Sequence, residues 1–151
     1  MSWQAYVDNQ LLGTGKIAQA AIYGHNGSLW ATSPGFSLNN EEITTLVEAF
    51  DDAEKIQANG IYANGVKYFA LSHDKTNIHG KKGNDGIVAE KTTQAVIIGI
   101  YKEGTVAGQA NKVVGDLGDY LRNLSYVSIN LKLNFVQLII ILRKIGQLLL
   151  F

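Results

Sequence analysis

The chain has 151 residues, of which 46% are hydrophobic and 17% charged, with thirteen basic side chains against thirteen acidic ones. This length and composition predict one globular domain with its own core, and the zero net charge argues against a general nucleic-acid binder. The absence of cysteine excludes disulfides and thiolate metal sites and permits the cytosol, and no charged leader precedes an apolar run, so we expect no standard secretion signal.

The first predicted element is a short helix at the N-terminus. Ser2 is suited to cap it, Trp3 and Tyr6 lie on one of its faces, and Gly13 and Gly15 end it. Chain ends are usually polar and frayed. A tryptophan and a tyrosine at this end therefore suggest an exposed aromatic surface.

Two strands and a helix follow. Residues 16–23 and 29–32 are predicted strands, joined as a hairpin by the turn residues 25–27. Asn39 or Asn40 caps the next helix, which has an apolar stripe and carries acidic residues at its positive N-terminal end.

After Phe50 the sequence predicts strands separated by short turns, and then one more helix. A turn is predicted at 84–86, and strands are predicted at residues 60–63, 66–73, 77–81, 87–91 and 95–101. Strands joined by short turns are antiparallel. From Val106 to Leu124 the apolar period is helical. The predicted fold class is therefore α+β, an antiparallel sheet with terminal helices and at least one helix between them.

The segment 127–151 differs in composition from the rest of the chain. It has no acidic residue, its only charges are Lys132, Arg143 and Lys144, and it begins with strand-like alternation as far as Phe135. The adjacent cations interrupt the one window apolar enough to cross a membrane, so we expect no spanning helix, with an interfacial helix as an alternative. Ile, Leu, Phe, Asn and Lys are what AT-rich non-coding DNA encodes. We interpret the segment as an artefact of the gene model, such as a retained intron.

The opening Met-Ser-Trp-Gln-Ala-Tyr-Val-Asp, from Met1 to Asp8, resembles the start of profilins, closest to the fungal type. The resemblance extends to about Tyr126, which implies a profilin domain over residues 1–126 and an atypical apolar extension over 127–151. It implies a central antiparallel sheet with the N- and C-terminal helices packed together on one face and a shorter helix on the other. It also implies a cytoplasmic protein of the actin cytoskeleton that is not an enzyme and has no cofactor.

The resemblance implies a groove between the terminal helices that binds proline-rich partners such as formins. A polyproline II helix suits an aromatic groove, because it is already extended and offers flat rings and free carbonyl groups. Indole and phenol groups donate to those carbonyls while their faces pack on the rings. For Trp30, inside an apolar strand, a place in the core is the alternative interpretation. The matching residues are Trp3, Tyr6, Trp30, Tyr120, Leu121 and Tyr126.

The resemblance also implies a surface for monomeric actin, centred on the residues from Lys102 to Lys112. There Lys112 would pair with actin carboxylates, Asn111 would donate or accept a hydrogen bond, and Gly108 would allow close approach. On the sequence alone this stretch also fits a solvated loop and helix start. The matching residues are Lys67, Lys91, Gly108, Asn111, Lys112 and Asp116.

Three positions depart from the family pattern on this surface. Ser72 and Thr76 stand where an arginine is common in related profilins, and Thr93 stands where a lysine is frequent. Loss of arginine removes bidentate geometry as well as charge. The predicted function is an actin-monomer-binding protein that regulates polymerisation and links actin to proline-rich partners. The alternative is a proline-rich-peptide interaction module whose actin binding is weakened or lost.

Other chemistry finds little support. His79, Lys81 and Lys82 are candidates for phosphatidylinositol 4,5-bisphosphate, which profilins bind through basic surface residues, although an ordinary solvated hairpin also explains them. The string from Gly13 to Lys16 resembles half a phosphate loop but lacks the first glycine and the hydroxyl that would meet Mg²⁺. The three histidines lack metal-ligand spacing, and no nucleophile–base motif is present, so we expect neither a metal site nor catalytic residues.

Overall fold

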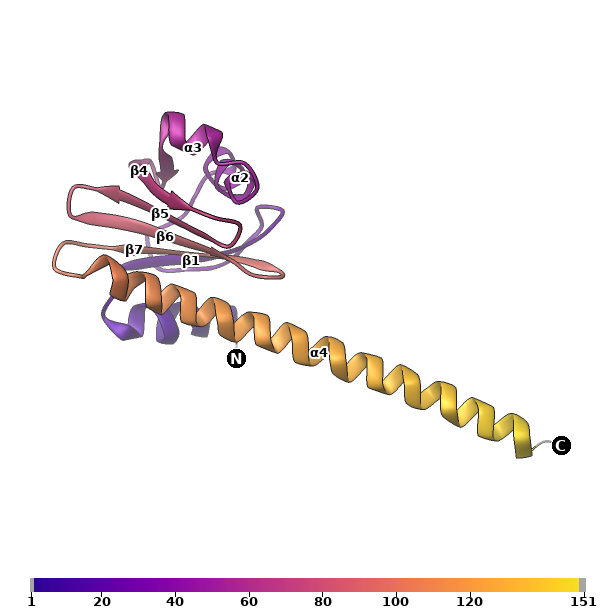
Figure 1. The fold of residues 1–151 in the computed structure, drawn as a ribbon. Helices are drawn as coiled ribbons and strands as arrows, with labels where there is room; N and C mark the ends of the chain where they lie inside the picture. The colour runs from indigo at the N-terminus through magenta and orange to yellow at the C-terminus, as the bar shows by residue number, and fades with distance from the viewer. Residues whose placement is uncertain (1, 150–151) are drawn as a thin grey trace.

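The computed structural model describes residues 2–149, and the side chains of residues 2–125, 131 and 134–145. Within these residues, seven antiparallel strands form one sheet in the order β2-β1-β7-β6-β5-β4-β3 (Figure 1). The α+β prediction is confirmed. The strands are β1 (Gln19–Gly24), β2 (Leu29–Thr32), β3 (Ile61–Ala63), β4 (Val66–His73), β5 (Asn77–Lys82), β6 (Asp85–Lys91) and β7 (Ala95–Tyr101).

The N-terminal helix begins where Ser2 predicts it. The Ser2 hydroxyl accepts a hydrogen bond from the Ala5 amide at 3.1 Å. Gly15 ends the helical turns with a φ of 72°, a left-handed conformation that glycine adopts without a steric penalty, and Gly13 lies inside the last turn. The turns are α1 (Trp3–Ala5), η1 (Tyr6–Leu11) and η2 (Leu12–Thr14).

Two helices cover the opposite face of the sheet. Asn39, rather than Asn40, caps α2 (Asn40–Ala49). The Asn39 side chain accepts a hydrogen bond from the Glu42 amide at 2.8 Å, and the Glu42 carboxylate accepts one from the Asn39 amide at 2.9 Å. The second helix, α3 (Glu54–Asn59), was not predicted. It has six residues and one fully buried side chain, Ile56, so it is too short to show a helical apolar period.

Two of the predicted strand boundaries are wrong by two residues or more, and three others differ by one residue. β1 begins at Gln19 rather than at residue 16, and β6 begins at Asp85 rather than at residue 87. Asp85 pairs with Lys82 in the ladder, so the turn falls at residues 83–84, where Gly83 has a φ of 60°. The Asp85 carboxylate also accepts from the Glu103 amide at 2.9 Å, which holds the residue in the strand.

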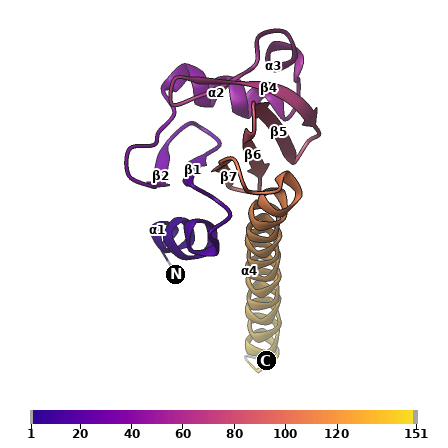
Figure 2. The ribbon, with the colours of Figure 1, turned by 90° about the vertical axis from the view of Figure 1, so that its left-hand side faces the viewer.

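Each face of the sheet carries a buried core, although the terminal helices leave β4 uncovered. One core lies between the sheet and α2 and α3, and the second lies between the sheet and the terminal helices, which run side by side (Figure 2). The packing of the terminal helices on one face, with shorter helices on the other, agrees with the prediction. Side chains of the second core include Val7, Leu11, Ile97, Val114, Leu117 and Leu121.

The C-terminal helix α4 (Ala107–Leu149) spans 43 residues and projects beyond the sheet (Figure 1). The strand-like alternation after residue 126 does not correspond to a strand, because the helix continues through it. The segment has apolar residues at helical spacing too, and extending an existing helix costs less than nucleating a new structure. Within the part of the chain that the structure describes, no helix is long and apolar enough to cross a membrane.

The capping assignment gives a stability prediction. Asn39→Ala should lower the free energy of unfolding by about 1 kcal/mol, because the Glu42 amide loses its acceptor at the helix start. Asn40→Ala is the matched control and should leave stability nearly unchanged, because Asn40 is exposed and caps nothing. Urea denaturation followed by tryptophan fluorescence measures both. Equal losses for the two variants would contradict the assignment of Asn39 as the cap.

Candidate functional site

Four of the predicted aromatic residues form a continuous array across three elements. Trp30 on β2 lies 4.7 Å from Trp3 between ring centroids, Trp3 lies 5.7 Å from Tyr6, and Tyr6 lies 6.2 Å from Tyr120 on α4. Trp3 and Trp30 are half-buried, and Tyr120 is 50% exposed. We call these four residues the aromatic array. The structure therefore brings together aromatic side chains that are more than a hundred residues apart in the sequence.

One hydrogen bond and part of the core hold the array in place. The Gln4 side chain donates to the Thr32 carbonyl at 3.0 Å, which ties α1 to β2 beside Trp30. Leu121 is 7% exposed and packs in the core with Val114 and Leu117. Leu121 therefore supports the array from below instead of lining its surface. Burial, with a smaller contribution from Tyr120, raises the pKa of Tyr6, so its phenol keeps its proton.

A groove of about 410 Å³ lies between the N-terminal helical turns and α4, next to the array. Most of its lining was not identified from the sequence, because polar residues such as Gln10 and Thr14 on a short helix show no distinguishing pattern. Asp116, predicted for the actin surface, lies in this groove. The Tyr126 side chain lies outside the described side chains. The lining residues are Tyr6, Gln10, Thr14, Val113, Asp116, Leu117 and Tyr120.

A second surface lies where α4 begins. A groove of about 620 Å³ joins β4, β5 and β7 to the start of α4, and Leu71 and Val106 line it while remaining 57% and 63% exposed. Gly108 follows directly, and a Cβ there would meet no atom within 4 Å. Asn111 and Lys112 complete this surface. We call Leu71, Val106, Gly108, Asn111 and Lys112 the helix-start surface.

The apolar part of this surface was missed in the sequence. Residues of β4 are apolar on both faces, so their period does not say which face is exposed. Tyr68 is 3% exposed and belongs to the core under α2 and α3, whereas Phe69 and Leu71 are 64% and 57% exposed on the other side. Exposed large apolar side chains gathered in one place indicate a binding surface.

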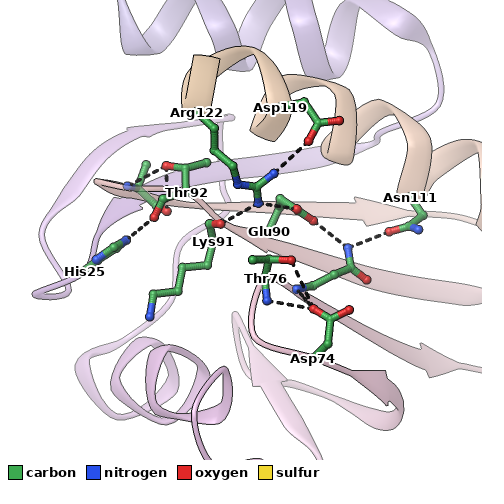
Figure 3. Close-up of polar contacts among 11 residues, drawn as sticks. His25, Asp74, Thr76, Glu90, Lys91, Thr92, Asn111, Asp119 and Arg122 are labelled. Carbon is green, nitrogen blue, oxygen red and sulfur yellow. Dashed lines mark hydrogen bonds and ion pairs between the residues drawn. The ribbon is translucent and has the colours of Figure 1, made fainter. Parts of the chain in front are cut away.

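The predicted actin residues do not all share one place. Lys67 is exposed on β4, with its ammonium 5.5 Å from the centroid of the Phe69 ring, on the same face of the sheet as the helix-start surface. Lys91 ends β6 with its side chain directed away from α4 (Figure 3). Lys112 forms an ion pair with Asp116 at 2.9 Å, and this hydrogen bond raises the pKa of the Lys112 ammonium.

The three basic residues proposed for phosphoinositide do not form one cationic patch. His79 is bonded to the Tyr101 hydroxyl at 2.7 Å, and burial, together with the nearby Lys81, lowers the pKa of His79, so it is neutral at pH 7. Lys81 and Lys82 are successive residues of β5 and therefore point to opposite faces. Within the described residues, no cluster of acidic and histidine side chains has the arrangement of a metal site.

Comparison with known proteins identifies relatives of this chain. The family model of profilin matches residues 1–126. Profilin-A of Physarum polycephalum is 48% identical over 126 residues, which are 83% of this chain and all of the relative. The crystal structure of profilin II of Acanthamoeba castellanii is 44% identical, with a TM-score of 0.80 over 82% of this chain and 99% of that one.

A mouse structure adds a bound partner. Mouse profilin IIa, in complex with a double repeat from the FH1 domain of mDia1, is 26% identical to this chain. The TM-score is 0.70, over 83% of this chain and 99% of the mouse chain.

Proposed function

The chain belongs to the profilin family, and we propose that it binds its two kinds of partner through the two surfaces described above. It is a non-enzymatic protein that binds monomeric actin, regulates actin polymerisation and links actin to proline-rich partners. The aromatic array takes the proline-rich segment, and the helix-start surface takes actin. The cytoplasm is the compartment that this proposal assigns to it.

The geometry of the aromatic array supports its assignment to proline-rich ligands. Its rings lie edge-on or tilted to each other at 4.7 to 6.2 Å, so together they offer a ridged apolar surface. A polyproline II helix has flat rings that pack on such a surface and carbonyls that need donors. The Tyr120 hydroxyl, on a side chain that is 50% exposed, is one donor of that kind. The FH1 repeat bound to mouse profilin IIa is a ligand of this chemistry.

The observation that carries the actin assignment is the exposure of apolar side chains beside a cation and an amide at the start of α4. Leu71 and Val106 offer apolar contact, and Lys112 offers a charge that is 75% exposed. Protein interfaces combine an apolar centre with polar groups at the rim. Gly108 adds an open position where a partner backbone can approach. Phosphoinositide binding receives no comparable support from His79, Lys81 and Lys82.

The alternative function is a proline-rich-peptide module with weakened actin binding. It rests on Ser72 and Thr76, which stand where related profilins carry arginine. Thr76 has a structural role, because its amide and hydroxyl bond the Asp74 carboxylate at 2.8 and 3.3 Å in the turn before β5. A measured affinity for actin monomers decides between the two functions.

Trp3→Ala should abolish retention on a polyproline column, because Trp3 joins Trp30 to Tyr6 in the array. Actin affinity should stay within about twofold of the parent chain, since the helix-start surface is elsewhere. Tyr62→Ala is the matched control, because it removes a 45% exposed aromatic side chain from β3, at the far edge of the sheet. Unchanged retention of a folded Trp3→Ala protein would overturn the assignment of the array.

Lys112→Glu should weaken actin binding by about 2 kcal/mol, roughly 30-fold, as expected for the loss of an interface hot spot. Lys55→Glu is the control, because it makes the same charge change at an exposed lysine of α3 on the other face of the sheet. Titration of fluorescent actin monomers measures both. If the two variants bind actin equally well, the helix-start surface is not where actin binds.

A further inference from the structure

An apolar stripe with heptad spacing runs along α4, and between Val136 and Ile141 the helix is also apolar and exposed off the stripe. The stripe alternates steps of four and three residues and begins inside the domain, where Ala110, Val114, Leu117 and Leu121 are at most 7% exposed. It continues without a change of register into the projecting part of the helix, with Ser128 as its one polar position. There its described members are 43% to 64% exposed: Leu124, Leu131, Phe135, Leu138, Leu142 and Ile145.

A sustained heptad stripe is the pattern of helices that pack on one another. Seven residues make slightly less than two turns of a straight helix, so the stripe stays in contact only with a partner around which it supercoils. The sheet is that partner only as far as Leu121. A segment translated from non-coding DNA has no reason to keep the register of the helix before it.

Two of the three charges of this segment lie away from the stripe. Arg143 and Lys144 follow Leu142 at positions that face away from it, so two copies can approach there without placing these like charges in contact. Leu124, Leu131 and Leu138 occupy one of the two core positions of the heptad. We propose that two copies of this chain associate through the exposed half of the α4 stripe.

Two substitutions in the full chain test the proposal by light scattering after size exclusion. Leu138 lies on the stripe and Ile140 lies off it, yet they are 51% and 47% exposed. We expect the parent chain and Ile140→Glu to have twice the monomer mass, and Leu138→Glu to be monomeric. A monomeric parent chain would overturn the proposal. Equal effects of the two substitutions would also overturn it, because the copies would then associate without using the stripe. A parent chain that is monomeric but sediments with anionic vesicles would assign the helix to a lipid surface instead.

A second observation concerns the polar contacts under α4. The Glu90 side chain is 7% exposed, and its carboxylate accepts from Arg122 at 2.6 Å and from the Asn77 side-chain nitrogen at 2.7 Å (Figure 3). The same nitrogen of Asn77 donates to the Asn111 side-chain oxygen at 2.9 Å. Gly118 makes room for this arrangement, because a Cβ there would lie 2.6 Å from Glu90.

The carboxylate determines the direction of every hydrogen bond in this chain of contacts. A carboxylate only accepts, so Asn77 must turn its nitrogen toward Glu90. Its second hydrogen then reaches Asn111, which must present its oxygen inward. The Asn111 nitrogen is left facing outward, and among the described residues it has no acceptor. The surface thus presents a donor at this position.

We infer that Asn77, held by Glu90, is a positioning residue that orients the Asn111 amide so that it takes an acceptor oxygen on actin. This inference rests on the proposed function of the helix-start surface. It assigns a role to a half-buried side chain that itself need not touch actin.

Actin titrations with Asn77→Ala, Asn111→Ala and the double variant test the inference. Each single change should weaken binding about 3- to 10-fold, as expected for one hydrogen bond, and the double variant should bind no more weakly than Asn111→Ala. A purely structural role of Asn77 predicts instead that the two effects multiply, which would overturn the inference. Asp119→Ala, which removes only the exposed contact of Arg122 at 3.0 Å, should leave actin affinity unchanged.

The same titrations separate this inference from the proposed function. If Lys112→Glu weakens actin binding and Asn111→Ala does not, actin binds the helix-start surface but the positioning role of Asn77 is wrong. If neither substitution weakens actin binding, the proposed actin surface and the positioning role are both wrong. Polyproline retention of each variant confirms that it is folded.

Discussion

The packing of α4 on β7 is the contact on which both surfaces depend. Gly99 lies in the middle of β7, and a Cβ there would lie 2.9 Å from the Val114 side chain, so only glycine allows α4 to approach this closely. From that contact, Ala110, Leu117 and Leu121 continue the buried stripe. A helix held this firmly along one stripe presents its two flanks in fixed directions, so the positions of the exposed residues follow from the helical period.

The flanks of α4 contribute to the two proposed surfaces. Val113, Leu117 and Tyr120 lie toward the N-terminal turns and form the groove beside the aromatic array. Asn111 lies toward β5 and β6 and joins the network around Glu90. The helix therefore carries both proposed surfaces and connects them to one sheet, and they adjoin at the ion pair between Lys112 and Asp116. A protein that links actin to proline-rich partners has to hold both at once, so on this proposal each partner must leave the other surface accessible.

Local signals in the sequence were enough for much of the fold. The helix start at Ser2 and the turn before Leu29 are predicted from a capping residue and from turn residues. The strands β2, β4 and β7 have their predicted bounds. What failed needed tertiary information. The helix α3 is too short to show a helical apolar period, and the segment after residue 126 has apolar residues at both helical and strand spacing. The aromatic residues were predicted from the resemblance to profilins. Only the packing of the helix on the sheet shows that Leu121 lies beneath them and that Lys91 faces away from α4. The outward direction of the Asn111 amide depends on the Glu90 carboxylate of β6, acting through Asn77 of β5, and no local sequence rule connects these strands to α4.

We expect the aromatic array and the helix-start surface to bind proline-rich segments and actin independently. Measuring actin affinity with and without a saturating proline-rich peptide tests it most directly, because any coupling between the sites appears as a ratio of the two dissociation constants. The two constants should agree within about twofold, and a complex of all three components should form. Displacement of actin by the peptide would contradict it, because the two ligands would then share one surface.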